Sequence, residues 1–489
     1  MIKFQTDFSF KTEKDHLIIG IFSDVKHPVI GQLDRLLNKR LTLLLTDQFI
    51  STELGAVTPI HTYSQISSKL IYFVGLGNSQ DFTLTKSKKI FAKISKTLNE
   101  DAVILLDTFE VMKNSIADLA HVAGESLTLA SYQVKTYKTK KEDTSACELR
   151  IHSKVLVENE LKRGIIYGDA TNQARQLVNE PASTLTAAEL AQTILNFTKE
   201  YSLEARVVEK DEMFELGMGG LLGVNQGSTE EPKMIVAKYQ GTPRFENITA
   251  LVGKGVTFDT GGYSLKSRDG MYGMHTDMGG AASAFGAFMV AVRLKLPVNL
   301  LLVIPATDNM VSATALKPGD VIRMMNQKTV EVSNTDAEGR LILADGITFA
   351  KHLGASRIIN LATLTGAIVA ALGDMTGAFT NNQAFFDKFY TAAELTGEDV
   401  WPMPIRARHH EALRCASEIA DLNNSPKGQP GAIMAATFLK EFVEDTPWIH
   451  LDIAGTASSR TSNDLNPKGG TGVMVRTIAK YLELSATPE

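Results

Sequence analysis

The 489-residue chain has only two cysteines, Cys147 and Cys415, which lie far apart and outside any CxxC spacing. So few thiols argue against a disulfide framework and against a thiolate metal site, and they fit a reducing compartment. An excess of basic residues is missing as well, since the formal net charge is −5. This balance gives no reason to expect nucleic acid or an anionic membrane as a partner.

Long apolar runs are also absent. The N-terminus has no continuous apolar segment and no small-residue cleavage site, so no signal peptide is expected. The longest apolar-leaning run, residues 361–373, is too short to span a bilayer and contains two threonines. These absences predict a soluble, cytoplasmic protein.

The sequence does contain alternating β-rich and helix-compatible runs, which are typical of α/β proteins. Its length favours two to three domains. We predict an N-terminal α/β domain over residues 1–155, a connecting helix over 156–180, and a larger α/β domain over 181–489. The Lys-rich segment 135–153 is interpreted as a solvated loop or hairpin.

The larger domain is predicted to contain a mainly parallel central sheet flanked by helices. The expected strands are residues 233–239, 248–255, 299–306, 357–364 and 447–455, and the expected helices are 279–296, 339–354, 431–444 and 472–484. Strands this apolar, alternating with helices, imply a sheet covered on both faces. Active sites of such sheets lie at the carboxyl ends of the strands.

Charged residues gather near these expected strand ends. Lys254 and Asp259 follow directly after an apolar strand, and Asp277 comes just before a Gly-rich helix start. The segment 331–346, EVSNTDAEGRLILADG, adds two further carboxylates next to apolar sequence. If its centre is extended, Asp336, Glu338 and Arg340 project from the same side, because side chains alternate along a strand.

Four carboxylates in one cleft would repel each other, and burying unpaired charge is costly. Two divalent cations would neutralise them, and carboxylate oxygens are suitable ligands. Nearby lysine and arginine could compensate instead in a plain ion-pair network, and Asp277 could simply cap the helix that begins near Gly279. The spacing alone leaves these alternatives open.

Several motifs of this region closely resemble those of the leucyl (cytosol) aminopeptidases, peptidase family M17. They are RQLVNEPA, GKGVTFDTGG, DMGGAA, NTDAEGRL, LATLTGA, HLDIAGTA and GGTGVMVRT, and they occur in the family's order over residues 175–476. The resemblance implies that residues 181–489 form a dinuclear metallo-aminopeptidase domain, which releases leucine and other apolar N-terminal residues from peptides. Over residues 1–150 the resemblance is only architectural.

The resemblance also implies the metal ligands, which are Lys254, Asp259, Asp277, Asp336 and Glu338. Asp259 and Glu338 would bridge two ions, Asp336 would bind one of them, and Lys254 and Asp277 the other. Zinc is expected, with manganese, magnesium or cobalt able to occupy the more exchangeable position. Lysine binds a metal only as a neutral amine, and its deprotonation at pH 7 costs roughly 4.6 kcal/mol, a cost that a neighbouring dication could offset.

Two further residues match the catalytic positions of the family. Lys266 would stay protonated and stabilise the oxyanion of the tetrahedral intermediate. Arg340 would hold a bicarbonate ion that acts as a proton shuttle. A salt bridge from Arg340 to Glu338 or Asp336 is an alternative that the sequence leaves open.

Substrate contacts follow from the same resemblance. Thr363, Leu364 and Gly366 are expected along the main chain of the substrate. Met274 is expected in the pocket for its first side chain, although ordinary core packing is an alternative. His275 and Tyr263 depart from the common pattern, and for His275 we favour a structural or supporting role over that of a ligand.

Two other functions are compatible with parts of the sequence. A two-metal phosphoesterase would use similar carboxylates but would bring more histidine ligands and an arginine clamp. An architectural or DNA-binding role beside catalysis would need a basic patch, and the acidic balance counts against it. The resemblance implies peptide substrates and a homohexamer. The charge balance and the lack of long apolar runs predict no membrane partner and count against a nucleic-acid partner.

Overall fold

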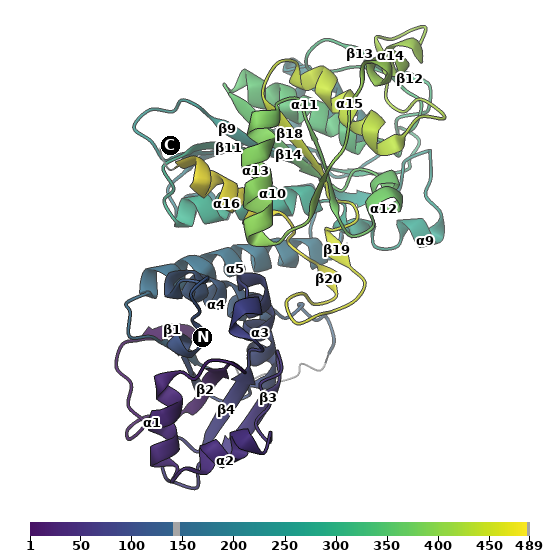
Figure 1. Ribbon diagram of the computed structural model, residues 1–489. Coiled ribbons are helices and arrows are strands. Elements are labelled where there is room, and N and C mark those ends of the chain that lie inside the picture. Colours follow the sequence, from purple (N-terminus) through teal and green to yellow (C-terminus); the bar gives the residue numbers. More distant parts are fainter. Residues whose placement is uncertain (140–146, 487–489) are drawn as a thin grey trace. The chain divides into compact units, whose positions relative to one another are not determined.

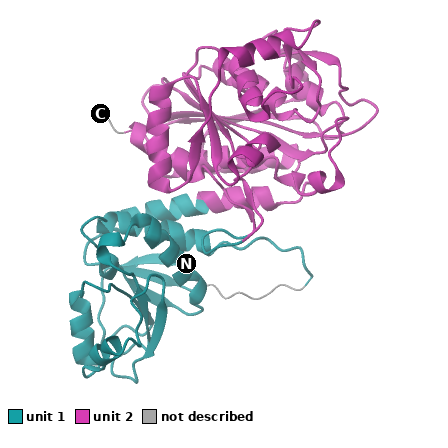
Figure 2. Cartoon of the chain, turned by 45° about the vertical axis from the view of Figure 1, so that its right-hand side comes forward, with its two compact units in different colours: residues 1–169, 462–467 teal, residues 170–461, 468–489 magenta. Residues whose placement is uncertain are grey.

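The computed structural model describes residues 1–139 and 147–486, and the chain divides into two compact units (Figure 2). Unit 1 comprises Met1–Asp169 and Ser462–Pro467, and unit 2 comprises Ala170–Thr461 and the chain from Lys468 onward. Helix α5, Glu158–Asn179, begins in unit 1 and ends in unit 2. It lies within the range predicted as a connecting helix.

Unit 1 is built on one six-stranded sheet with the order β1-β6-β5-β2-β4-β3. Its strands are β1 Ile2–Gln5, β2 His16–Ile21, β3 Val57–His61, β4 Leu70–Gly75, β5 Ala102–Leu105 and β6 Leu149–His152. All pairings are parallel except that of the edge strand β3 with β4. Its main helices are α1 Pro28–Leu36, α2 Arg40–Thr46, α3 Leu84–Thr97 and α4 Ile116–Ala130. Separate apolar cores include residues from opposite sides of the strands, such as Ile18 and Ile19 of β2.

One prediction for this unit is wrong. The segment 135–153 was expected to be a solvated loop or hairpin, but its end forms β6, which lies between β1 and β5 and pairs with both in parallel. Leu149 and Ile151 are buried in the core, and this burial outweighs the polar character of the segment. Residues 140–146 of the same segment lie outside the described part of the chain.

Unit 2 has a nine-stranded sheet with the order β16-β15-β18-β14-β9-β11-β8-β7, and β10 pairs with β11 outside this path. The strands are β7 Glu204–Val208, β8 Lys233–Gln240, β9 Thr249–Gly253, β10 Gly255–Asp259, β11 Asn299–Asn309, β14 Arg357–Ala362, β15 Thr376–Thr380, β16 Val400–Pro402 and β18 Trp448–Asp452. The central strands β11, β9, β14 and β18 are parallel, and antiparallel pairs occur towards the edges. The predicted α/β class and mainly parallel core are confirmed.

Helices cover both faces of this sheet (Figure 1). One face carries α10 Gly279–Arg293, α13 Gln383–Thr396 and α16 Val475–Ala486, and the other carries α8 Gly219–Asn225, α11 Gly339–His352 and α15 Gly431–Val443. Helix α10, which follows Asp277 of the candidate site, approaches the sheet closely through glycine. A Cβ at Gly280 of α10 would lie 2.2 Å from the carbonyl oxygen of Leu361 on β14. Only glycine allows this approach.

The remaining elements are short or lie at the periphery. They are helices α6 Ala187–Glu200, α7 Lys210–Glu215, α9 Arg268–Met271, α12 Gly366–Leu372 and α14 Ala407–Cys415, and strands β12 Asp320–Arg323, β13 Thr329–Val332, β17 Leu422–Asn423, β19 Ser458–Ser459 and β20 Gly469–Gly470. Strands β12, β13 and β17 form a separate small sheet. Strand β13 leads directly into the segment that precedes α11.

A buried carboxylate fastens α11 to its surroundings. Asp345 is fully buried and accepts hydrogen bonds from the backbone N–H of Leu221 at 2.9 Å and of Met325 at 3.0 Å. Leu221 belongs to α8, and Met325 lies in the turn between β12 and β13. Asp345 therefore joins three elements of unit 2 around the helix that begins at the candidate site.

The variant Asp345→Ala is expected to be strongly destabilised. It leaves two buried N–H donors without an acceptor, which costs about 2 to 6 kcal/mol. Differential scanning calorimetry should show a lower melting temperature for the transition of unit 2. Asp387→Ala, which removes an exposed carboxylate from α13, is the matched control. Equal melting temperatures for the two variants would contradict this role of Asp345.

Candidate active site

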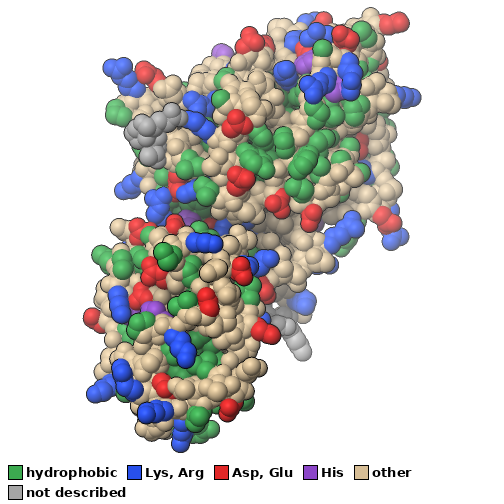
Figure 3. Space-filling view, in the orientation of Figure 1, with side chains coloured by type: hydrophobic (Ala, Val, Ile, Leu, Met, Phe, Trp, Pro, Cys, Tyr) green, Lys and Arg blue, Asp and Glu red, His purple; other side chains and the backbone are tan. Residues whose placement is uncertain are grey.

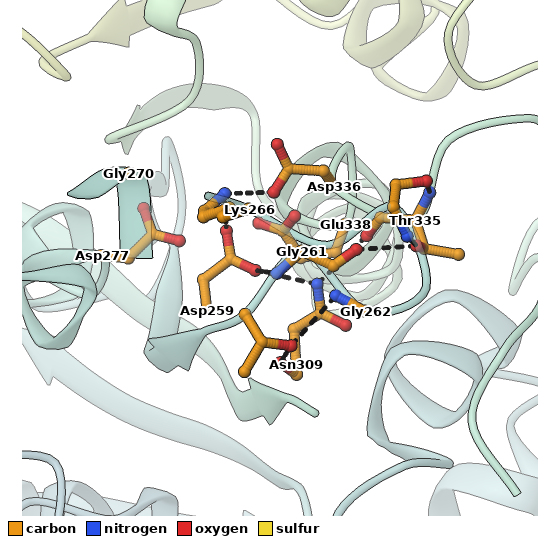
Figure 4. Close-up of polar contacts among 12 residues, drawn as sticks. Asp259, Gly261, Gly262, Lys266, Gly270, Asp277, Asn309, Thr335, Asp336 and Glu338 are labelled. Carbon is orange, nitrogen blue, oxygen red and sulfur yellow. Dashed lines mark hydrogen bonds and ion pairs between the residues drawn. The ribbon is translucent and has the colours of Figure 1, made fainter. Parts of the chain in front are cut away.

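The predicted charged residues come together at the carboxyl ends of the central strands of unit 2 (Figure 4). Lys254 follows β9, Asp259 is the last residue of β10, and Thr363 follows β14. Asp277 lies just before α10, and Glu338 immediately precedes α11. Because these strands are parallel, their loops gather at the same edge of the sheet, which is where α/β proteins place their active sites.

Two details of the sequence-based placement are wrong. Asp259 does not directly follow the strand before Lys254, because a separate strand, β10, lies between them. The segment around Asp336 is not extended either, since it turns at Thr335 and Asp336 and enters α11 at Gly339. The side-chain oxygen of Asn334 accepts from the backbone N–H of Asp336 at 2.9 Å, and this local bond favours a turn over a strand.

Lys254 is the centre of one group of ion pairs. Its Nζ lies 2.7 Å from Asp277 Oδ2 and 2.9 Å from Glu338 Oε1, and it donates to the carbonyl oxygen of Thr363 at 3.0 Å. The residue is only 2% exposed. A Cβ at Gly339 would lie 2.8 Å from this Nζ, so glycine at that position leaves room for the lysine. Lys254 is thus a buried component of the site and not an exposed lysine in a turn.

Lys266 is the centre of a second group. Its Nζ lies 2.7 Å from Asp259 Oδ2 and contacts Asp336 Oδ1 (Figure 4). The loop that carries Lys266 begins with Gly261 and Gly262, at φ values of 84° and 60°. A Cβ at Gly261 would lie 2.8 Å from Asp336 Oδ1. These two glycines let the chain turn back, so that Lys266 faces the carboxylates.

The carboxylates resist ionisation at this site. Burial raises the pKa of Glu338 to about 8, and the charge of Asp259 adds to this effect. Burial also raises the pKa of Asp277 to about 6. Burial disfavours the charged form of Lys254, but the negative charges of Asp277 and Glu338 outweigh this and raise its pKa. The site is therefore one in which positive charge is required to keep the carboxylates ionised.

The donor set suits divalent cations. One carboxylate oxygen from each of Asp259, Asp336 and Glu338 lies within 4.8 Å of the others. Glu338 Oε2 is buried and has no hydrogen-bond partner among the described residues. A buried acceptor of this kind is costly unless a cation or another donor meets it. The alternative role of Asp277 as the cap of α10 is not observed, because no side chain caps that helix. The Oδ1 of Asp277 instead accepts a hydrogen bond from Thr363 Oγ1 at 2.7 Å.

Arg340 is buried but does not join the ion pairs. Its Nη1 donates to the carbonyl oxygen of Asn424 at 2.7 Å, and no ion pair of Arg340 with Glu338 or Asp336 occurs in the described part of the chain. Burial lowers the pKa of Arg340 to about 10, so the guanidinium remains protonated at neutral pH. The alternative of a salt bridge to Glu338 or Asp336 is therefore not observed, and among the described residues the guanidinium has no anionic hydrogen-bond partner.

The predicted substrate-binding residues lie in two segments beside these groups. Met274 is half-buried in the short helical turn Met274–Thr276, which leads into Asp277. Thr363 and Leu364 follow β14, and Gly366 begins α12 with open space around it. The carboxylate of Asp452 accepts from the backbone N–H of Leu364 at 3.1 Å and so fixes this segment.

Two residues that hold the site in place, Asn309 and Asp452, were not predicted from the sequence. Asn309, at the end of β11, donates through Nδ2 to Asp259 Oδ1 at 2.8 Å and to the carbonyl oxygen of Thr335 at 3.1 Å. Asp452, at the end of β18, accepts from Leu364 and from Thr365 Oγ1. Both are polar residues at the ends of apolar runs, and this position is the signal that could have found them.

The two departures from the family pattern lie beside the site. His275 is half-buried. Among the described residues, the cluster of possible metal ligands consists of Asp259, Asp336 and Glu338 and does not include His275. Tyr263 is 44% exposed, and its hydroxyl donates to the carbonyl oxygen of Ser312 at 2.8 Å. Tyr263 therefore ties the Lys266 loop to the loop that follows β11.

Lysines and carboxylates collected in this way at the strand ends of an α/β sheet define a hydrolase-like site that is suited to metal ions. The chain belongs to the cytosol aminopeptidase family. Residues 172–479 match the catalytic domain of that family, and residues 18–141 match its N-terminal domain. A Bacillus licheniformis protein described as "Probable cytosol aminopeptidase" is 47% identical over 491 residues, which cover 97% of this chain and 98% of the relative.

Solved structures agree with this assignment. A bottromycin maturation enzyme in complex with Mn is 30% identical, with a TM-score of 0.86, and the match covers 97% of this chain and 100% of the other. A mutant tomato leucine aminopeptidase is 30% identical, with a TM-score of 0.85, over 99% of this chain and 96% of the other. These relatives support an aminopeptidase function.

Among the described helices, none has the length and apolar character needed to cross a bilayer.

Proposed function

We propose that the protein is a dinuclear metallo-aminopeptidase that removes leucine and other apolar residues from the N-termini of peptides. The observation that carries this proposal is the cluster of Asp259, Asp336 and Glu338, whose ligand oxygens lie within 4.8 Å of one another. Lys254 adjoins the cluster through its ion pair with Glu338, and Asp277 in turn pairs with Lys254. Asp259 and Glu338 would each bind both ions.

When bound, the two ions would activate water and polarise the scissile carbonyl group. The chain's own residues prepare the site for this. Lys254 would bind as a neutral amine, and its contacts with Asp277 and Glu338 keep its nitrogen beside the proposed ligand carboxylates. Asn309 fixes the orientation of the Asp259 carboxylate through its hydrogen bond to Oδ1. These contacts limit the rearrangement that metal binding requires.

Lys266 is proposed to stabilise negative charge during the reaction. Its ammonium group lies on the Asp259 and Asp336 side of the cluster, and those carboxylates raise its pKa although burial alone would lower it. Lys266 therefore remains protonated at neutral pH. A fixed cation at the position where an oxyanion develops stabilises the transition state more than the ground state.

Substrate recognition is assigned to the segments beside the cluster. Thr363, Leu364 and Gly366 would line the substrate main chain, and Met274 would contact its first side chain. A flexible, polarisable methionine suits varied apolar residues. One metal would hold the free α-amino group, which restricts cleavage to the N-terminus of the peptide.

The remaining parts of the proposal concern cofactors and assembly. Zinc or manganese is proposed for the two positions, with magnesium or cobalt possible at the more exchangeable one, and bicarbonate is proposed at Arg340. Arg340 is buried and protonated and has no carboxylate partner within residues 1–139 and 147–486, which supports an anion there. We further propose a cytoplasmic homohexamer, which rests on the family alone.

The rival functions have less support. The family assignment favours an aminopeptidase over a two-metal phosphoesterase, and the clustered ligands of the described residues are carboxylates without histidine. For DNA binding, a basic surface would be needed. On the face shown in Figure 3, basic and acidic side chains are interspersed, in keeping with the net charge of −5.

Metal removal tests the proposed function. Chelator-treated protein should lose its activity on a panel of aminoacyl-amides, and adding back zinc or manganese should restore it, with leucine and other apolar residues preferred. The chelated protein should keep its circular dichroism spectrum, because Lys254 and Lys266 already pair with the ligand carboxylates. Full activity after chelation would overturn the proposal.

A further inference from the structure

A single buried hydroxyl group joins the Lys266 loop to the turn that carries Asp336. Thr335 Oγ1 accepts a hydrogen bond from the backbone N–H of Ser264 at 2.8 Å and donates to the carbonyl oxygen of Gly261 at 2.7 Å (Figure 4). The backbone N–H of Thr335 donates in return to Ser264 Oγ at 3.1 Å. Thr335 is only 2% exposed, so water hardly competes for these bonds. Reciprocal hydrogen bonds therefore hold the two segments together.

The loop from Thr260 to Lys266 is closed on itself, so this attachment also restrains the lysine. The backbone N–H of Lys266 donates to the carbonyl oxygen of Thr260 at 3.0 Å. Thr260 is anchored in turn to the end of β11, because its N–H and its hydroxyl group donate to the carbonyl oxygen of Asn309 at 3.0 and 2.8 Å. A loop that is closed at its base and attached at Ser264 has little freedom to move, and Lys266 is its last residue.

The ion pairs of Lys266 would not by themselves fix its ammonium group once metal is bound. Its partners, Asp259 and Asp336, are also proposed metal ligands, so in the loaded site they share their negative charge with the ions. A lysine side chain is a flexible four-carbon stem with one charge at its end. The position of the ammonium group then depends on the backbone that carries it.

We propose that Thr335 is a positioning residue, whose hydroxyl group holds the Lys266 loop so that the lysine faces the ligand carboxylates. The inference rests on the proposed function for the role of Lys266, and Thr335 acts only through that lysine. The hydroxyl group is the part of the side chain that matters. A valine has nearly the same shape but can neither accept from Ser264 nor donate to Gly261.

Thr335→Val tests this role kinetically. We expect kcat to fall about ten- to hundredfold, because a small displacement of a catalytic group has an effect of this size. KM should change little, and metal analysis should still find two ions per chain. Thr335→Ser keeps the hydroxyl group and should restore kcat to near the wild-type value. Thr437→Val removes another buried hydroxyl group, from α15, and is the matched control that should leave kcat unchanged.

A double variant shows whether Thr335 acts through Lys266. If it does, Thr335→Val should lower kcat no further in a Lys266→Ala background, because the group that it positions is already missing. Ser264→Ala removes the reciprocal bond, should also lower kcat, and replaces Thr335→Val if that variant does not fold. The inference is overturned by an equal loss of kcat in the two backgrounds or by wild-type kcat in Thr335→Val. It is also overturned if excess metal restores kcat, since Thr335 would then support the ligand Asp336 instead.

Hydrogen exchange of the metal-free protein tests the attachment of the loop without any activity. Peptides that cover residues 260–266 should exchange faster in Thr335→Val than in the wild type, because the Ser264 N–H loses its acceptor. In Thr437→Val they should exchange as in the wild type, and equal exchange in all three proteins would overturn the inference. A wild-type protein without peptidase activity under any metal would overturn the proposed function and the catalytic role of the loop, while the exchange result would still decide whether Thr335 holds it.

Discussion

Replacing Glu338 by alanine is expected to abolish peptidase activity by removing the carboxylate proposed to bind both metal ions. Glu338 immediately precedes α11, is 2% exposed, and has one oxygen on Lys254 and the other without a partner among the described residues. Loss of a bridging ligand affects both metal positions at once. A metal ion contributes several kcal/mol of transition-state stabilisation, so kcat/KM should fall by at least about a thousandfold.

The Glu338→Ala variant should also bind fewer ions. Mass spectrometry of the bound metal should find two ions per wild-type chain and at most one in the variant. Glu331→Ala, on the neighbouring strand β13, is the matched control and should keep both ions and full activity. A Glu338→Ala protein that kept two ions and wild-type turnover would contradict the assignment of Glu338 as the bridge.

The second large effect is expected for Lys266→Ala, which should reduce kcat while both ions stay bound. The ammonium group of Lys266 lies 2.7 Å from Asp259 Oδ2 and is proposed to stabilise the developing oxyanion. Removing one such donor lowers kcat by about a hundred- to a thousandfold. KM should change little, because the interaction strengthens only in the transition state.

The control for Lys266 comes from the same segment of chain. Arg268 follows in α9 with a side chain that is 98% exposed, and Arg268→Ala should leave kcat unchanged. Steady-state kinetics and metal analysis on both variants make the comparison. If Lys266→Ala lost its metal while a metal-saturated sample regained full kcat, Lys266 would be an electrostatic support for the ligands and not a catalytic residue.

Much of the site could be predicted because its residues lie in short, specific motifs. Lys254, Asp259, Asp277, Asp336 and Glu338 all come together at one edge of the sheet, as the alternation of apolar strands and helices suggests. The helix starting at Gly339 was also predicted correctly, because its apolar residues recur with helical period. These features depend on local sequence.

The features that were missed or misplaced depend on contacts distant in the sequence or on fine turn geometry. Asn309 meets Asp259 across 50 residues, and neither residue alone indicates the other. Asp336 lies in a turn because Asn334 accepts its backbone N–H, and alternation of charges could not distinguish this from a strand. The end of the Lys-rich segment became β6 because two neighbouring strands bury Leu149 and Ile151.

Asp259 and Glu338 are proposed to hold two metal ions between them. Anomalous diffraction from crystals of the manganese-loaded protein measures this most directly. We expect two anomalous peaks, both within coordination distance of Asp259 and Glu338, one also near Asp336 and the other near Lys254 and Asp277. An active enzyme whose crystals show no anomalous peak at these carboxylates would contradict the claim.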